Sequence, residues 1–196
     1  MAFRLKKTAI FFASLVIISL VSLYIYMEEQ GNFHEITPGE AYRSAQLDRD
    51  ELEYYIKKYN IKSILNLRGE NPDAPWYIEE LQVSSELNVK HYDIALSATR
   101  KLTDREIHKL IEIFKSAPRP ILIHCKSGAD RSGLIAAIWK VVVDGVSESE
   151  AKKQLTPLYG HLSVNETKAM DESFDEFFEK WTKGIYSETK FQRLLE

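Results

Sequence analysis

Residues 124–133, with the sequence HCKSGADRSG, place one cysteine and one arginine six positions apart in a stretch that contains glycine. A thiolate is a strong nucleophile, and a planar guanidinium binds two oxygens of one phosphoryl group. Cys125 and Arg131 therefore predict a phosphate-binding loop built around a nucleophile. In such a loop we expect Cys125 to attack phosphorus, a cysteinyl-phosphate to form, and water to hydrolyse it.

The elements on either side of this loop must hold it in place. The apolar run at 120–123 predicts a short buried strand, and the run 134–143 predicts a buried helix. Backbone amides and the positive end of the helix dipole would then face an anion. The same field, together with Arg131, favours the thiolate form of Cys125. Ser132 follows Arg131 and can hydrogen-bond to that thiolate, which eases its departure in the second step.

The pattern His-Cys-x5-Arg-Ser-Gly resembles the signature of the cysteine-dependent protein tyrosine phosphatase superfamily. Over roughly residues 36–165 the chain is similar to the bacterial dual-specificity-phosphatase-like branch. The resemblance implies a hydrolase that uses no cofactor or metal, with Cys125 as nucleophile and Arg131 as phosphate clamp. It also implies a substrate-binding loop made of Lys126, Ser127, Gly128, Ala129, Asp130 and Arg131. The alternative for Cys125 is a small buried residue without a chemical role.

The general acid that protonates the leaving group has two candidates. Asp93 ends a predicted strand, where the family's acid loop begins, but positions 96–98 hold Leu, Ser and Ala where dual-specificity enzymes tend to carry an Asp. Asp130 lies inside the signature loop, and its placement is similar to that in myotubularin lipid phosphatases and in bacterial tyrosine phosphatases with lipid activity. We favour Asp130 and keep Asp93 as the alternative. Asp130 could instead be an exposed charge or an ion-pair partner of Arg43 or Arg68.

The other polar residues near these motifs are expected to have structural and not catalytic roles. We expect Arg43 and Arg68 to form surface ion pairs, although both could reach the phosphate. Lys126 resembles the lysine that follows the nucleophile in the tumour-suppressor phosphoinositide phosphatase, but a solvated loop charge is the expected reading. His124 is expected to shape the loop by hydrogen bonding and not to act as a base.

The N-terminus carries a predicted membrane anchor. Residues 8–27 form a run of 20 positions without a charge, long enough to cross a bilayer as a helix. The run is preceded by Arg4, Lys6 and Lys7 and followed by Glu28 and Glu29. This asymmetry predicts a cytoplasmic N-terminus and an extracytoplasmic catalytic domain. The alternative is a signal peptide whose cleavage would leave a secreted domain.

The composition excludes some classes of partner. The chain has 26 basic residues, three of which lie in the N-terminal tail, against 29 acidic ones. The remaining chain is therefore acidic, and we expect no nucleic-acid partner. A single cysteine excludes both an internal disulfide and a cysteine metal cluster.

The predicted organisation is a basic cytoplasmic tail (1–7), the anchor (8–27), a connector (28–35), a phosphatase domain (36–185) and a C-terminal tail (186–196). Helical patterns at 48–59, 76–87 and from Thr103 alternate with strand patterns at 63–67 and 89–94. This alternation predicts an α/β fold whose central, mostly parallel sheet is flanked by helices, with the site at the carboxyl ends of the strands. Past Gly145 we expect helices, and an aromatic stripe at 174–181 is expected to pack in the core.

Three classes of function remain open. The first is a membrane-anchored phosphatase acting on phosphotyrosine or phosphoserine/threonine in proteins, with phosphoinositides, phospholipid head groups or inositol phosphates as alternative substrates. The second is a module that binds phosphate without turnover. The third is sulfur or arsenate chemistry, which also uses Cys-x5-Arg loops but generally needs further cysteines.

Overall fold

The computed structural model describes residues 30–186 and, before them, residues 11–12, 14–15, 17–19, 21–22 and 25. Half of the predicted anchor at 8–27 and nearly all of the predicted tail at 186–196 lie outside the described residues. Within the described residues, no helix is both long and apolar enough to span a membrane.

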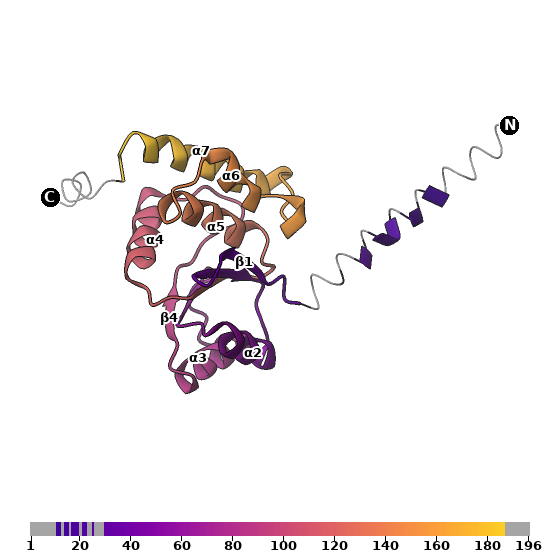
Figure 1. Ribbon diagram of the computed structural model, residues 1–196, viewed down its shortest axis with the longest axis vertical. Coiled ribbons are helices and arrows are strands. Elements are labelled where there is room, and N and C mark those ends of the chain that lie inside the picture. Colours follow the sequence, from indigo (N-terminus) through magenta and orange to yellow (C-terminus); the bar gives the residue numbers. More distant parts are fainter. Residues whose placement is uncertain are drawn as a thin grey trace.

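A five-stranded sheet forms the centre of the domain (Figure 1). Its strands are β1 His34–Thr37, β2 Ala41–Ser44, β3 Ser63–Asn66, β4 Lys90–Asp93 and β5 Ile121–His124. The spatial order is β1-β2-β5-β3-β4, in which only the β1–β2 pair is antiparallel. The predicted α/β fold with a mostly parallel sheet is therefore confirmed. The first strand begins inside the predicted connector.

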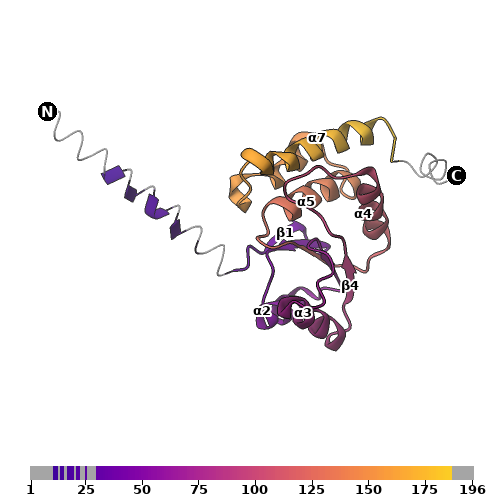
Figure 2. The ribbon, with the colours of Figure 1, turned by 180° about the vertical axis from the view of Figure 1, so that it is seen from behind.

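Helices cover both faces of the sheet, as the two opposite views show (Figures 1 and 2). One face carries α2 Arg49–Tyr59 and α3 Pro75–Glu86, and the other carries α4 Asp104–Ser116, α5 Asp130–Val142, α6 Glu148–Ala151 and α7 Lys168–Thr182. Helices α2 and α4 each begin with a complete capping box, formed by Asp48 with Glu51 and by Thr103 with Glu106. These two helix starts agree with the sequence patterns.

Helix α5 begins four residues earlier than its apolar pattern predicts. The pattern starts at Leu134, but the helix starts at Asp130. Apolar periodicity detects only the buried part of a helix. The first turn of α5 is polar because it belongs to the signature loop at 124–133, which we call the catalytic loop. Asp130 and Arg131 therefore lie in the first turn of a helix.

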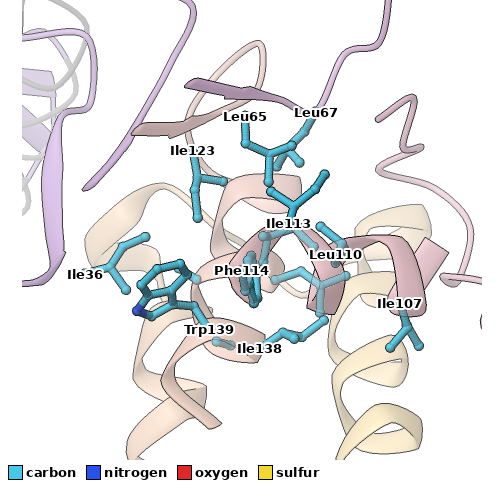
Figure 3. Packing of buried hydrophobic residues seen from close by; sticks show 14 of the residues in the cluster. Ile36, Leu65, Leu67, Ile107, Leu110, Ile113, Phe114, Ile123, Ile138 and Trp139 are labelled. Carbon is cyan, nitrogen blue, oxygen red and sulfur yellow. The ribbon is translucent and has the colours of Figure 1, made fainter. Parts of the chain in front are cut away.

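Alternating side chains on the strands build two separate cores. On β5, Ile121 and Ile123 face α4 and α5, whereas Leu122 packs on the opposite face with α2. Figure 3 shows Ile123 above Phe114 and Trp139, whose rings meet edge to face with centroids 4.9 Å apart. The aromatic stripe packs here as predicted. Because both faces are covered, the strand ends that hold the site are rigidly placed.

The segment between α6 and α7 is the part of the fold that the helical prediction missed. It contains only three short 3-10 turns, η1 Lys152–Gln154, η2 Pro157–Tyr159 and η3 Asn165–Thr167. Pro157 begins the second turn and Gly160 ends it in the left-handed conformation. The prediction of helices throughout this region is therefore wrong, and the irregular path brings Tyr159 and His161 to the catalytic loop.

Candidate active site

The carboxyl ends of four strands meet at one edge of the sheet. Ser44, His124, Asn66 and Asp93 are the last residues of β2, β5, β3 and β4, and they are aligned in register. The signature loop leaves β5 at this edge and enters α5. The predicted position of the site at the carboxyl ends of the strands is the observed position of this loop.

Cys125 lies at the base of the loop. It is 1% exposed, and its Sγ is 3.5 Å from Oγ of Ser132 in the first turn of α5. Arg131 donates from Nη1 to the carbonyl oxygens of Leu67, at 3.4 Å, and Leu96, at 3.3 Å. These bonds fix the guanidinium between the segments that follow β3 and β4. The arrangement brings together the predicted nucleophile, its hydroxyl partner and the phosphate clamp.

Arg43 on β2 supports the loop from beneath. Its side chain is completely buried, and its Nη2 donates to the carbonyl oxygens of Gly128 and Ala129, both at 2.9 Å. Since the N–H and C=O of a planar peptide point in opposite directions, these bonds turn the amides of Ala129 and Asp130 toward the other side, where phosphate would bind. Burial lowers the pKa of Arg43 to about 10, although the nearby charge of Asp130 favours its cation. The prediction that Arg43 forms a surface ion pair is wrong.

Gly128 and Asn32 complete this support. Gly128 has φ +69°, and a Cβ there would lie 2.6 Å from the amide nitrogen of Ala45, so no other residue fits without moving β2. Asn32, in the predicted connector, donates from Nδ2 to the carbonyl oxygens of Ser127, at 3.0 Å, and Tyr159, at 3.1 Å. The connector is therefore attached to the catalytic loop and to the segment after η1.

Asp130 is bonded to a histidine that the sequence reading did not single out. Its Oδ1 lies 2.7 Å from Nδ1 of His161, and Nε2 of His161 lies 3.1 Å from Oδ2 of Asp171 on α7. Burial opposes the charged form of His161, but its hydrogen bonds to Asp130 and Asp171 outweigh burial and raise its pKa above the usual value. The alternative partners Arg43 and Arg68 do not bond to Asp130 in the described part of the chain. Its side chain is 22% exposed at the edge of the loop.

Asp93, the other candidate acid, is held by three side chains. Its Oδ1 accepts from Asn66 Nδ2 at 2.8 Å, and its Oδ2 accepts from the hydroxyl of Tyr77 at 2.9 Å and lies 3.2 Å from His91 Nδ1. Strand β3 lies between Asp93 on β4 and His124 on β5, so the two backbones are about 10 Å apart, twice the spacing between neighbouring strands. Asp93 is thus fixed by its neighbours at some distance from Cys125, whereas Asp130 lies inside the loop.

Glu80 on α3 forms a second buried group beneath the loop. It is 3% exposed, and it accepts from Gln46 Nε2 at 2.8 Å and contacts Nε2 of His91 at 2.8 Å and of His124 at 3.2 Å. Burial raises the proton affinity of this carboxyl, but the charge of His124 and the three hydrogen bonds outweigh burial, and the pKa of Glu80 falls below its usual value. His124, expected to shape the loop, is thus anchored to Glu80. Only the tertiary structure identifies Glu80, which stands among other polar residues of a helix.

Arg68 and Lys126 lie at the mouth of the loop. The guanidinium carbon of Arg68 is 3.5 Å from the ring centroid of Trp76, and its Nη1 donates to Gln46 Oε1 at 3.1 Å. Burial and the charge of Arg131 lower the pKa of Arg68 below its usual value. The described contacts of Arg68 include no carboxylate, so its predicted surface ion pair is wrong. Lys126 is exposed, as expected.

The fold and the loop define a domain of the cysteine-dependent tyrosine and dual-specificity phosphatase superfamily. More narrowly, the chain belongs to the family described as "DSP-PTPase phosphatase fused to NAD+ Kinase", which matches residues 21–175. The resemblance inferred from the signature loop is therefore confirmed.

Two relatives of known name are similar to parts of the chain. "Dual specificity protein phosphatase TpbA" of Pseudomonas aeruginosa is 33% identical over 57 residues, which cover 28% of this chain and 26% of the relative. "Inositol diphosphatase SIW14" of Saccharomyces cerevisiae is 26% identical over 154 residues, which cover 76% of this chain and 51% of the relative. The chain thus spans about a quarter to a half of the length of these relatives.

Solved structures of the same two proteins share the fold. The crystal structure of P. aeruginosa TpbA gives a TM-score of 0.59 at 21% identity, and the match covers 74% of this chain and 84% of that one. The core catalytic domain of the PP-IP phosphatase SIW14, in complex with citrate, gives a TM-score of 0.58 at 23% identity, and the match covers 80% of this chain and 94% of that one.

Proposed function

We propose that this chain hydrolyses phosphomonoesters through a cysteinyl-phosphate. The observation that carries the proposal is the buried Cys125 at the base of a loop whose carbonyls are held outward by Arg43. The thiolate attacks phosphorus, so an S–P bond forms while the P–O bond to the leaving group breaks. Arg131 and the loop amides hold the phosphoryl oxygens, and Asp130 gives a proton to the leaving oxygen.

The second step releases inorganic phosphate. Water attacks the phosphorus of the cysteinyl-phosphate and gives its proton to Asp130, while the S–P bond breaks and sulfur leaves as a thiolate. Ser132, 3.5 Å from Cys125 Sγ, donates a hydrogen bond to that sulfur. The enzyme returns to its starting state, with phosphate and an alcohol or phenol as products.

The first candidate substrates are phosphotyrosine and phosphoserine/threonine in proteins. The name of TpbA, a dual specificity protein phosphatase, supports this class. Release of phosphate from phosphotyrosine and phosphothreonine peptides by the 196-residue chain tests it, with Cys125→Ser as the blank. If the chain binds inorganic phosphate but turns over none of the esters, it is a binding module and the enzyme proposal is wrong.

A second candidate class is a phosphoinositide, a phospholipid head group or an inositol phosphate. Arg68 beside Arg131 and the exposed Lys126 offer cations for a further phosphate near the one in the loop. SIW14, named an inositol diphosphatase, supports this class. Phosphoinositides and inositol phosphates assayed beside the peptides separate the two classes by their ratios of kcat/KM.

Membrane anchoring through residues 8–27 is part of the proposal. Asn32, which contacts the catalytic loop, is five residues after the end of that run, and five extended residues span at most about 18 Å. The anchor would therefore hold the site close to the outer face of the bilayer. In the segment that Asn32 also contacts, Leu158, Leu162 and Val164 are 63%, 54% and 56% exposed, and they favour a lipid surface as the neighbour.

Two measurements test the anchor. Retention in membranes after alkaline carbonate extraction is expected, and protease added to intact spheroplasts should digest the catalytic domain. Release of a shortened chain, with a new N-terminus near residue 27, would instead establish a cleaved signal peptide. Protection from the protease would overturn the proposed orientation.

A further inference from the structure

His161 lies between two carboxylates at the edge of the catalytic loop. Its Nδ1 is 2.7 Å from Asp130 Oδ1, and its Nε2 is 3.1 Å from Asp171 Oδ2. Three different elements supply these groups: Asp130 is on α5, His161 is in the segment after η2, and Asp171 is on α7. The histidine side chain is 1% exposed, whereas Asp130 is 22% exposed.

The number of hydrogens in this group follows from its geometry. Each of the two N···O contacts needs one hydrogen, and a neutral imidazole carries only one. The second hydrogen must come either from a protonated imidazole or from a protonated carboxyl group. Beyond the one hydrogen of a neutral imidazole, the three side chains therefore hold a further proton, which can lie on His161 or on either carboxylate. Of these groups Asp130 lies directly beside the loop that would bind phosphate.

We propose that His161 stores the proton that Asp130 delivers to the leaving group, with Asp171 fixing the imidazole from the far side. The proposal rests on the proposed phosphatase function and gives His161 the role of a positioning residue, since it acts through Asp130. In the resting state His161 is an imidazolium between two carboxylates.

The proton balance closes over one turnover. When a phosphoryl dianion enters the loop, its charge raises the proton affinity of the nearer carboxylate, and the Nδ1 proton moves to Asp130. Asp130 then protonates the leaving oxygen as the P–O bond breaks. In the hydrolytic step Asp130 takes a proton from the attacking water and returns it to Nδ1 of His161. No other acid or base is needed.

The surroundings of His161 favour storage of a proton. The charged groups that bond to it are Asp130 and Asp171, and the buried Arg43, bonded to the carbonyl oxygen of Ala129 beside Asp130, interacts electrostatically with Asp130. The two carboxylates raise the pKa of His161 even though its burial opposes the charged form. The ring itself is sealed from solvent, so its proton leaves through one of the two bonded carboxylates, and of these Asp130 is the one in the catalytic loop.

The chain contains a matched control in His91. This histidine also bridges two carboxylates, with Nε2 2.8 Å from Glu80 Oε1 and Nδ1 3.2 Å from Asp93 Oδ2. It is 9% exposed, and its pKa is likewise raised by these carboxylates against the effect of burial. Neither of its carboxylates lies in the catalytic loop, so His91→Gln perturbs a similar network without removing the proposed proton store.

The test compares aryl phosphates with good and poor leaving groups, p-nitrophenyl phosphate and phenyl phosphate, using the 196-residue chain. A positioned acid contributes about 10²–10⁴ in rate, so His161→Gln should lower kcat on phenyl phosphate about tenfold to a hundredfold, and kcat on p-nitrophenyl phosphate much less. The basic limb of its pH profile should move to lower pH, because Asp130 alone loses its proton earlier. His91→Gln should lower both rates by the same factor.

Further variants separate this role from a structural one. Asp171→Asn keeps His161 in place and should give the same selective loss at smaller size. Asp130→Asn combined with His161→Gln should be no slower than Asp130→Asn alone, because both changes interrupt one proton path. Circular dichroism checks that each variant is folded; if His161→Gln does not fold, Asp171→Asn decides.

The outcomes are distinct. If the wild type turns over both esters but His161→Gln slows them equally, or if its pH profile does not move, the proton store is wrong and the phosphatase function stands. If the wild type turns over neither ester, and none of the phosphopeptides, phosphoinositides or inositol phosphates, the proposed function is wrong and this inference fails with it.

Discussion

Two histidines of this domain are placed almost identically between carboxylates, yet their surroundings differ. His91 joins Glu80 to Asp93 beneath the catalytic loop, and His161 joins Asp130 to Asp171 at its edge. Glu80 and Asp93 accept further hydrogen bonds from side chains on several elements. For Asp130 and Asp171, His161 is the one side-chain donor among the described contacts.

This difference in hydrogen bonding supports the proposal that Asp130, and not Asp93, exchanges a proton with the substrate. Moving a proton onto a carboxylate that accepts several fixed hydrogen bonds breaks some of those bonds, whether it is sealed like Glu80 or partly exposed like Asp93. A carboxylate with one donor and partial exposure has an oxygen left for a proton. The Glu80 group therefore holds the shape of the loop, and the Asp130 group is suited to chemistry.

The largest expected effect is the loss of turnover when Cys125 is replaced, and it is the reference for the variants of the two carboxylate groups. Cys125→Ser should reduce turnover by about 10⁴ or more, because a hydroxyl is a far weaker nucleophile than a thiolate. Binding of inorganic phosphate, measured by isothermal titration, should persist because the amides and Arg131 are unchanged. Residual turnover near the wild-type level would show that Cys125 is not the nucleophile.

The next effect tests the comparison directly through one carboxylate of each group, Asp130 and Asp93. Asp130→Asn should lower kcat on phenyl phosphate by about 10²–10⁴ and on p-nitrophenyl phosphate much less, because only a poor leaving group needs the proton. Asp93→Asn serves as the matched change, and its loss should be equal for the two esters and accompanied by lower stability. If instead Asp93→Asn shows the selective loss, the acid is Asp93.

A third change breaks the sealed group. Glu80→Gln removes the charge that His91 and His124 face, and breaking a buried charged pair costs about 3–5 kcal/mol of unfolding free energy. Urea denaturation measures this loss. Glu79→Gln, at an exposed neighbouring position on the same helix, should change stability by less than about 0.5 kcal/mol. Equal effects at both positions would remove the structural role assigned to Glu80.

The smallest expected effect is the pH dependence of stability. Both His161 and His91 have a pKa raised in the folded state, so their contribution is fully present below the unfolded value of 6.5 and is lost as the pH rises through the folded values. The urea midpoint of the wild type should therefore fall above pH 6.5. His161→Gln and His91→Gln should each reduce this slope, and their reductions should add because the two groups share no partner. A slope that neither change alters would contradict both assignments.

The sequence predicted those parts of the protein that depend on residues close together in the chain. The HCKSGADRSG loop, the strand before it, the buried helix after it and the capping boxes are local patterns, because a turn or a helix start is decided within about four residues. The α/β architecture also followed, since alternating strands and helices have few ways to cover a sheet. These predictions agree with the structure apart from helix boundaries and the 3-10 segment at 152–167.

The tertiary structure alone decided how the loop is supported and which side chains hold Asp130 and Asp93. Arg43 reaches Gly128 across 85 residues, Glu80 reaches His124 across 44, and His161 reaches Asp130 across 31. Such contacts leave no periodic pattern, and the usual preference of arginine and glutamate for the surface points the wrong way. Burial reverses that preference here because each charge is hydrogen-bonded by the backbone or side chains of another element, although Nε of Arg43 has no hydrogen-bond partner among the described residues. The signature loop with its candidate nucleophile was therefore readable from the chain, and the charges that support the loop were not.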